Sequence, residues 1–135
     1  MRPCEVVDDP ELEAIRARKL AEFQRISARP VLDHPVELTG GSLGGFVAAH
    51  PIAVVDCWAA WCGPCRLMEP HLEALARELQ GHVAFGKLNV DEHPRTAEAF
   101  EVSSIPTLLV FRQGKLADRI VGAAPPQAIR ARLGV

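Results

Sequence analysis

The 135-residue sequence contains no long apolar segment, and no run approaches the roughly 20 residues that a helix needs to cross a bilayer. It also carries little net charge, because 15 basic and 17 acidic residues give a formal charge of -2. A protein that binds nucleic-acid phosphates needs a concentrated basic face instead. The N-terminus leads into Asp8 and Asp9 and not into an apolar secretory core. We therefore expect no membrane or nucleic-acid partner and a cytoplasmic location.

Cysteine is scarce, and the four residues Cys4, Cys57, Cys62 and Cys65 are too few to staple a chain of this length. Only Cys62 and Cys65 form a close pair, whereas a zinc site normally shows two pairs of ligands. For Cys62 and Cys65, the alternative to redox chemistry is a purely structural cysteine pair or one half of a zinc site. No Gly-rich phosphate fingerprint follows a predicted strand, so no nucleotide cofactor is implied. We expect no metal site and an incidental thiol at Cys4.

The sequence does have the composition of a soluble globular protein, with 48% apolar and 24% charged residues. We assign residues 1–35 to an N-terminal extension and residues 36–135 to the main domain. In the extension, Asp9 and Pro10 predict the start of a helix, and a proline-containing linker follows it. We interpret this as a helix packed on the main domain; an interaction arm and a frayed tail are the alternatives.

Strand and helix patterns alternate along the main domain. Residues 52–58 form a near-continuous apolar run, typical of a strand covered on both faces. Apolar residues recur at helical spacing from Gly63 to Leu79, and Pro70 predicts a kink there. The other predicted strands are 36–38, 83–90, 107–111 and 116–121, and the other predicted helices are 42–50, 94–100 and 125–133. This order predicts an α/β fold with helices on both faces of a mixed sheet, mostly parallel, that ends in a C-terminal antiparallel hairpin.

The cysteine pair follows the predicted strand at 52–58 and opens the longest helix of the main domain, where residues 61–65 read Trp-Cys-Gly-Pro-Cys. On the first turn of a helix, this spacing lets the two sulfurs close a small ring. Cys62 then lies where free backbone N–H groups and the positive end of the helix dipole favour thiolate over thiol. Such a thiolate can attack a disulfide in another molecule, and Cys65 can resolve the mixed disulfide that forms.

Residues 54–66, which read Val-Val-Asp-Cys-Trp-Ala-Ala-Trp-Cys-Gly-Pro-Cys-Arg, resemble the active-site segment of the thioredoxin family. Further features match the family in order and spacing: Pro70, Lys-Leu-Asn-Val-Asp at 87–91, Ile-Pro-Thr-Leu at 105–108 and Val-Gly-Ala at 121–123. The likeness extends from near Val36 to the C-terminus, and it implies a thioredoxin fold with an added N-terminal helix.

The resemblance also implies a function, a protein-disulfide reductase that acts through its Cys-Gly-Pro-Cys dithiol. The Cys62–Cys65 disulfide would take the place of a bound cofactor, and a thioredoxin reductase or similar electron donor would recharge it. We expect a monomer whose substrates are disulfides in target proteins. A disulfide oxidase or isomerase and a thioredoxin-fold subunit that only binds a partner are the alternatives.

Other residues take roles from the family positions that they match. Asp56 matches a buried carboxylate behind the cysteines that can accept the Cys65 proton, and Lys87 matches a nearby lysine that favours its ionised form. Pro106 matches a cis-proline that faces the disulfide, and the backbone of Ile105 can pair with an extended target peptide. The expected apolar rim for partner proteins consists of Trp61, Gly63, Pro64, Ile105, Gly122 and Ala123.

One position departs from the family pattern, because Cys57 stands where the family usually has an aromatic residue. Strand alternation places Cys57 and Asp56 on opposite faces of the sheet. We therefore expect Cys57 to be a small, buried, apolar residue. A second redox couple with Cys62 or Cys65 is the alternative, and it requires Cα atoms within about 7 Å.

Overall fold

The computed structural model describes residues 33–135 of the chain. The helix predicted in the extension and Cys4 lie outside the described residues, so the domain boundary near residue 35 stays a prediction. Within residues 33–135, no helix is both long and apolar enough to span a membrane.

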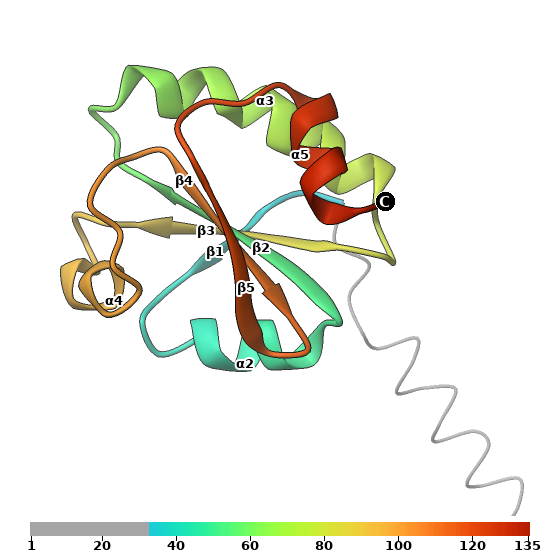
Figure 1. The fold of residues 1–135 in the computed structure, drawn as a ribbon. Helices are drawn as coiled ribbons and strands as arrows, with labels where there is room; N and C mark the ends of the chain where they lie inside the picture. The colour runs from blue at the N-terminus through green and yellow to red at the C-terminus, as the bar shows by residue number, and fades with distance from the viewer. Residues whose placement is uncertain (1–32) are drawn as a thin grey trace, which may run out of the picture. The chain divides into compact units, whose positions relative to one another are not determined.

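A mixed sheet of five strands forms the centre of the fold, in the order β1-β3-β2-β4-β5. The strands are β1 (Val36–Leu38), β2 (Ile52–Trp58), β3 (Ala84–Asn89), β4 (Thr107–Arg112) and β5 (Lys115–Val121). β3 pairs parallel with β1 and β2, whereas β4 pairs antiparallel with β2 and β5. Only β4 therefore runs against the other strands of the sheet, as Figure 1 shows. The predicted mixed sheet with its C-terminal antiparallel hairpin is confirmed. The structure also shows a second antiparallel pair, between β2 and β4, which the sequence prediction did not specify.

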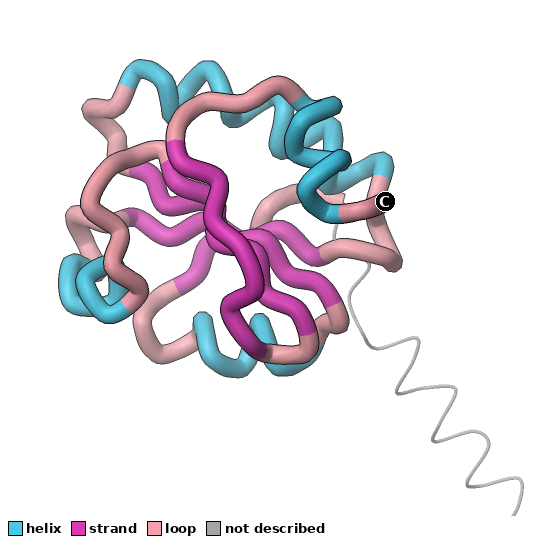
Figure 2. Tube along the Cα trace, in the orientation of Figure 1, coloured by secondary structure: helices cyan, strands magenta, loops and turns pink. Residues whose placement is uncertain are grey.

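Helices cover both faces of this sheet, as predicted. They are α2 (Leu43–Ala49), α3 (Gly63–Glu78), α4 (Pro94–Ala99) and α5 (Pro126–Leu133). α3 and α5 lie on one face and α2 on the other (Figures 1 and 2). The α3 helix continues through Pro70, and the kink predicted there stays a prediction. In the described residues, the predicted elements differ from the observed ones by at most one residue at either end.

Alternation along β2 divides the core into two clusters. Val54 packs with Met68 of α3 and with residues of α5 in one cluster. Val55 and Cys57 pack with residues of α2 in the other. Because successive side chains of a strand point to opposite faces, Asp56 lies on the face that α3 covers. The fold thus places this carboxyl behind the first turn of α3.

Candidate active site

The cysteine pair occupies the start of α3, as the sequence predicts. Cys62 is the N-cap residue, with an extended backbone, and Pro64 lies in the first turn, where its missing N–H breaks no helical hydrogen bond. Cys62 and Cys65 form a disulfide with Cα atoms 5.3 Å apart. The backbone N–H of Cys65 donates to Cys62 Sγ over 3.2 Å. This N–H and the positive end of the helix dipole favour a negative charge on that sulfur when the disulfide is reduced.

Two loops bring further predicted residues to the disulfide. Ile105 packs against the buried cluster that contains both cysteines. The Ile105–Pro106 peptide bond is cis, as the resemblance implies. The N–H of Gly122 donates to the carbonyl oxygen of Pro106 over 2.8 Å, which joins the loop after β5 to the loop before β4. The fold therefore brings two loops, one with Ile105 and Pro106 and one with Gly122, to the same side of the site, although both are far from the cysteine pair in the sequence.

Trp61 precedes the disulfide and is the most exposed large apolar side chain among residues 33–135, at 71%. Its indole Nε1 donates to Asp91 Oδ2 over 2.8 Å, and this bond restricts the orientation of the ring. A shallow pocket of about 380 Å³ lies beside it, lined by Trp61, Val90, Val102, Ser103, Ser104 and Ile105. The sequence prediction of the rim missed Val90 as well as Val102, Ser103 and Ser104, which directly precede Ile105.

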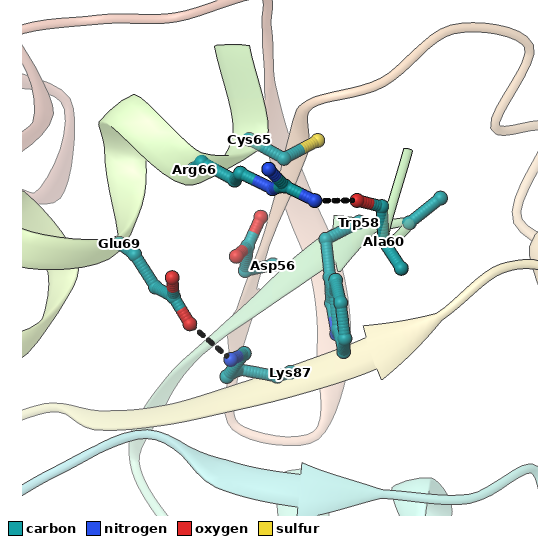
Figure 3. Close-up of a pocket in the computed structure, with 8 residues that line it drawn as sticks. Asp56, Trp58, Ala60, Cys65, Arg66, Glu69 and Lys87 are labelled. Carbon is teal, nitrogen blue, oxygen red and sulfur yellow. Dashed lines mark hydrogen bonds and ion pairs between the residues drawn. The ribbon is translucent and has the colours of Figure 1, made fainter. Parts of the chain in front are cut away.

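A second pocket, of about 220 Å³, lies behind the disulfide and is drawn in Figure 3. Its polar lining comes from three elements, with Asp56 on β2, Cys65, Arg66 and Glu69 on α3, and Lys87 on β3. The structure thus brings together Asp56, Lys87 and Cys65, as the resemblance implies. Sequence reasoning missed Arg66 and Glu69, although Glu69 stands four residues after Cys65 and therefore on the same side of the helix.

Asp56 is 2% exposed. Among residues 33–135, no hydrogen-bond donor reaches its Oδ1. Burial raises the pKa of this carboxyl to about 7, with Lys87 opposing the change and Glu69 adding to it. A group with such a pKa can take up and release a proton near neutral pH.

Lys87 is the register neighbour of Asp56 on the adjacent strand β3. Its ammonium, however, forms an ion pair with Glu69, with Nζ 3.0 Å from Oε1. The same Nζ lies 4.6 Å from the centroid of the Trp58 ring, a favourable position for a cation. Lys87 therefore lies close to Asp56, as predicted, while its direct charge partner is another carboxylate.

Cys57 is a free, buried thiol, as predicted. It packs in the apolar cluster on the α2 face, with Val55, Leu88 and Leu109. Burial raises the pKa of this thiol to about 12. Cys57 is thus on the opposite face of the sheet from the cysteine pair, which excludes the alternative of a second redox couple in this structure.

Cys57→Ser is expected to lower the free energy of unfolding by about 1–3 kcal/mol, because it buries a hydroxyl group among apolar side chains. Cys57→Val, which keeps an apolar side chain, should change it by less than about 1.5 kcal/mol. Denaturant unfolding of the three proteins measures both effects. Equal stability of Cys57→Ser and the unchanged chain would contradict the apolar role.

A disulfide at the N-terminus of a helix, with a buried carboxyl behind it, defines the class of thiol-disulfide oxidoreductases. A sequence model of the family described as Thioredoxin matches residues 35–134. The chain belongs to the thioredoxin family, whose members exchange disulfides with other proteins.

Individual relatives agree with this assignment. Thioredoxin 2 of Chlorobaculum tepidum is 48% identical over 82 residues, which are 61% of this chain and 75% of that protein. The thioredoxin of Staphylococcus aureus is 49% identical over 76 residues, which are 56% of this chain and 73% of that protein. The solved structure of a mutant thioredoxin from Halobacterium salinarum NRC-1 has a TM-score of 0.72 at 31% identity, over 76% of this chain and 90% of that one.

Proposed function

We propose that this chain is a protein-disulfide reductase that acts through the Cys-Gly-Pro-Cys dithiol at residues 62–65. The observation that carries the proposal is the position of the Cys62–Cys65 disulfide at the N-terminus of α3. In the reduced chain, the helix dipole and the Cys65 N–H favour the thiolate of Cys62. Cys62 is therefore the attacking sulfur and Cys65 the resolving one.

The reaction has two exchange steps. In the first, the Cys62 thiolate attacks one sulfur of a target disulfide; a bond forms between them, the target S–S bond breaks, and the second target sulfur leaves as a thiolate. In the second, Cys65 loses its proton and attacks Cys62 Sγ; the Cys62–Cys65 bond forms, and the first target sulfur leaves as a thiolate. Two electrons pass to the target, whose thiolates take up protons, and the chain is left as the disulfide seen in the structure.

Asp56 is the proposed acceptor of the Cys65 proton. Both residues line the pocket behind the disulfide, and a carboxyl with a pKa of about 7 is well suited to general acid–base catalysis at neutral pH. Lys87, next to it on β3, favours its ionised form. The proton passes to Asp56 while Cys65 becomes the nucleophile.

The rim around the disulfide is the proposed surface for the target. Ile105 packs beside the cysteines, so its backbone can pair with an extended target strand while Trp61 and its neighbours contact apolar side chains. The residues proposed for target binding are Trp61, Gly63, Pro64, Ile105, Pro106, Gly122 and Ala123. We further propose that the chain works as a monomer without a bound cofactor and that a separate thioredoxin reductase or similar donor reduces its disulfide.

Reduction of insulin with dithiothreitol as the electron source tests this function. We expect the chain to accelerate insulin precipitation severalfold over dithiothreitol alone. Equilibration with glutathione should then give a reduction potential of about -270 mV, the value typical of thioredoxins. A potential of about -120 mV, typical of a strong disulfide oxidant, would reject the reductase direction. No acceleration of precipitation would favour the alternative of a subunit that only binds a partner.

A further inference from the structure

Glu69 lies one turn after Cys65 on α3, and its side chain lines the pocket that contains Asp56 and points toward Lys87 (Figure 3). Its carboxylate is 3.0 Å from the Lys87 ammonium. The Glu69 side chain is 48% exposed and the Lys87 side chain is 15% exposed. Both side chains of the pair line this pocket. No part of the exchange reaction described above uses Glu69.

The ion pair has a consequence for Asp56. Lys87 is its register neighbour on β3 and the cation nearest to it in the sheet, so it is the natural counter-ion for the buried carboxyl. Figure 3 shows the Lys87 ammonium joined to Glu69 instead. Among residues 33–135, Asp56 Oδ1 has no hydrogen-bond partner. A buried carboxyl without a direct counter-ion favours its protonated form.

We propose that Glu69 is a positioning residue for the proton transfer at Cys65, because it binds the Lys87 ammonium and so keeps Asp56 a proton acceptor at neutral pH. If Lys87 paired directly with Asp56, that carboxylate would be a weaker base. This inference rests on the proposed function, in which Asp56 takes the proton that Cys65 loses before it attacks Cys62.

The other groups around Asp56 are consistent with this role. On α3, the Arg66 guanidinium also lines the pocket, but it donates to the Ala60 carbonyl oxygen over 2.8 Å. On β4, the register neighbour of Asp56 is Leu108, which carries no charge. The positive charge of Lys87 lowers the pKa of Asp56, and the negative charge of Glu69 raises it.

The test is a titration of the Asp56 carboxyl carbon by NMR in the oxidised chain, where Cys62 and Cys65 do not titrate. Glu69→Gln removes a like charge and releases Lys87, so the pKa of Asp56 should fall by about one unit. Glu73→Gln is the matched control, because it removes the same charge from an exposed position on the same helix. In single-turnover reactions, the acidic limb of the Cys65 resolution rate should move by the same amount for Glu69→Gln and stay in place for Glu73→Gln.

A double-mutant cycle separates action through Lys87 from direct repulsion. In a Lys87→Met background, Glu69→Gln should change the pKa of Asp56 by less than half as much as in the unchanged chain. An unmoved or raised pKa in Glu69→Gln, an equal shift in Glu73→Gln, or an equal shift with and without Lys87 would each overturn the inference. If insulin is not reduced while the pKa of Asp56 falls as expected, the proposed function fails and the electrostatic role of Glu69 stands.

Discussion

Cys62→Ser is expected to lower the rate of insulin reduction by at least about 100-fold, to that of dithiothreitol alone, because a hydroxyl does not ionise near neutral pH and cannot form a disulfide. The substitution replaces one sulfur by oxygen at the N-cap of α3, where serine is itself a favoured residue. The fold should therefore survive, and circular dichroism can verify that it does. Residual catalysis above the dithiothreitol background would contradict the role of Cys62.

Cys65→Ser should give the complementary result, a stable mixed disulfide. Cys62 can still attack the target, but no second sulfur is present to release it. Mass spectrometry should find the chain joined to insulin through Cys62, in an adduct that excess dithiothreitol removes. Cys57→Val is the matched control, since it removes a thiol on the opposite face of the sheet and should leave turnover unchanged. An adduct at Cys57 would contradict the assignment of the attacking sulfur.

The positions of Asp56 and Cys57 show how much of this site the sequence can predict. Two adjacent residues of an apolar strand must point to opposite faces, and the two core clusters confirm that Cys57 lies on the α2 face. The place of the cysteine pair at a helix start follows equally from local patterns, since only two residues separate the strand that ends at Trp58 from residues 61–65. Local periodicity is therefore sufficient to predict the positions of site residues where the strand, the turn and the helix that carry them are consecutive in the sequence.

The ion pair of Lys87 depends on tertiary structure instead. Glu69 and Lys87 are 18 residues apart, and they meet only because β3 lies next to β2 beneath α3. The resemblance places Lys87 near Asp56, but it does not say which of two carboxylates the ammonium binds. The same holds for Trp61 and Asp91, which are 30 residues apart and joined by a hydrogen bond. Such choices depend on side-chain distances that no sequence pattern contains.

Asp56→Asn is expected to raise the free energy of unfolding at pH 8 by about 2–4 kcal/mol. Burial raises the pKa of Asp56 from 3.8 to about 7 in the folded chain. Between these two pH values, the folded state holds a proton that the unfolded state has released, so stability falls as the pH rises. Each pKa unit corresponds to about 1.4 kcal/mol, which gives an upper limit of about 4 kcal/mol at pH 8. The unpaired amide of the variant cancels part of this gain.

The pH dependence distinguishes this electrostatic cause from a change in packing. Denaturant unfolding of the oxidised protein should show that Asp56→Asn is more stable than the unchanged chain at pH 8. At pH 4, where the carboxyl of the folded chain is neutral, this gain should disappear and only the cost of the unpaired amide should remain. Glu73→Gln, at an exposed position, should show no such dependence. At pH 7 the variant should also resolve mixed disulfides on the order of 10- to 100-fold more slowly, because an amide cannot accept the Cys65 proton. An equal stability difference at pH 4 and pH 8 would mean that Asp56 does not titrate with a raised pKa in the folded chain. Asp56 would then not be suited to accept the Cys65 proton in the second exchange step.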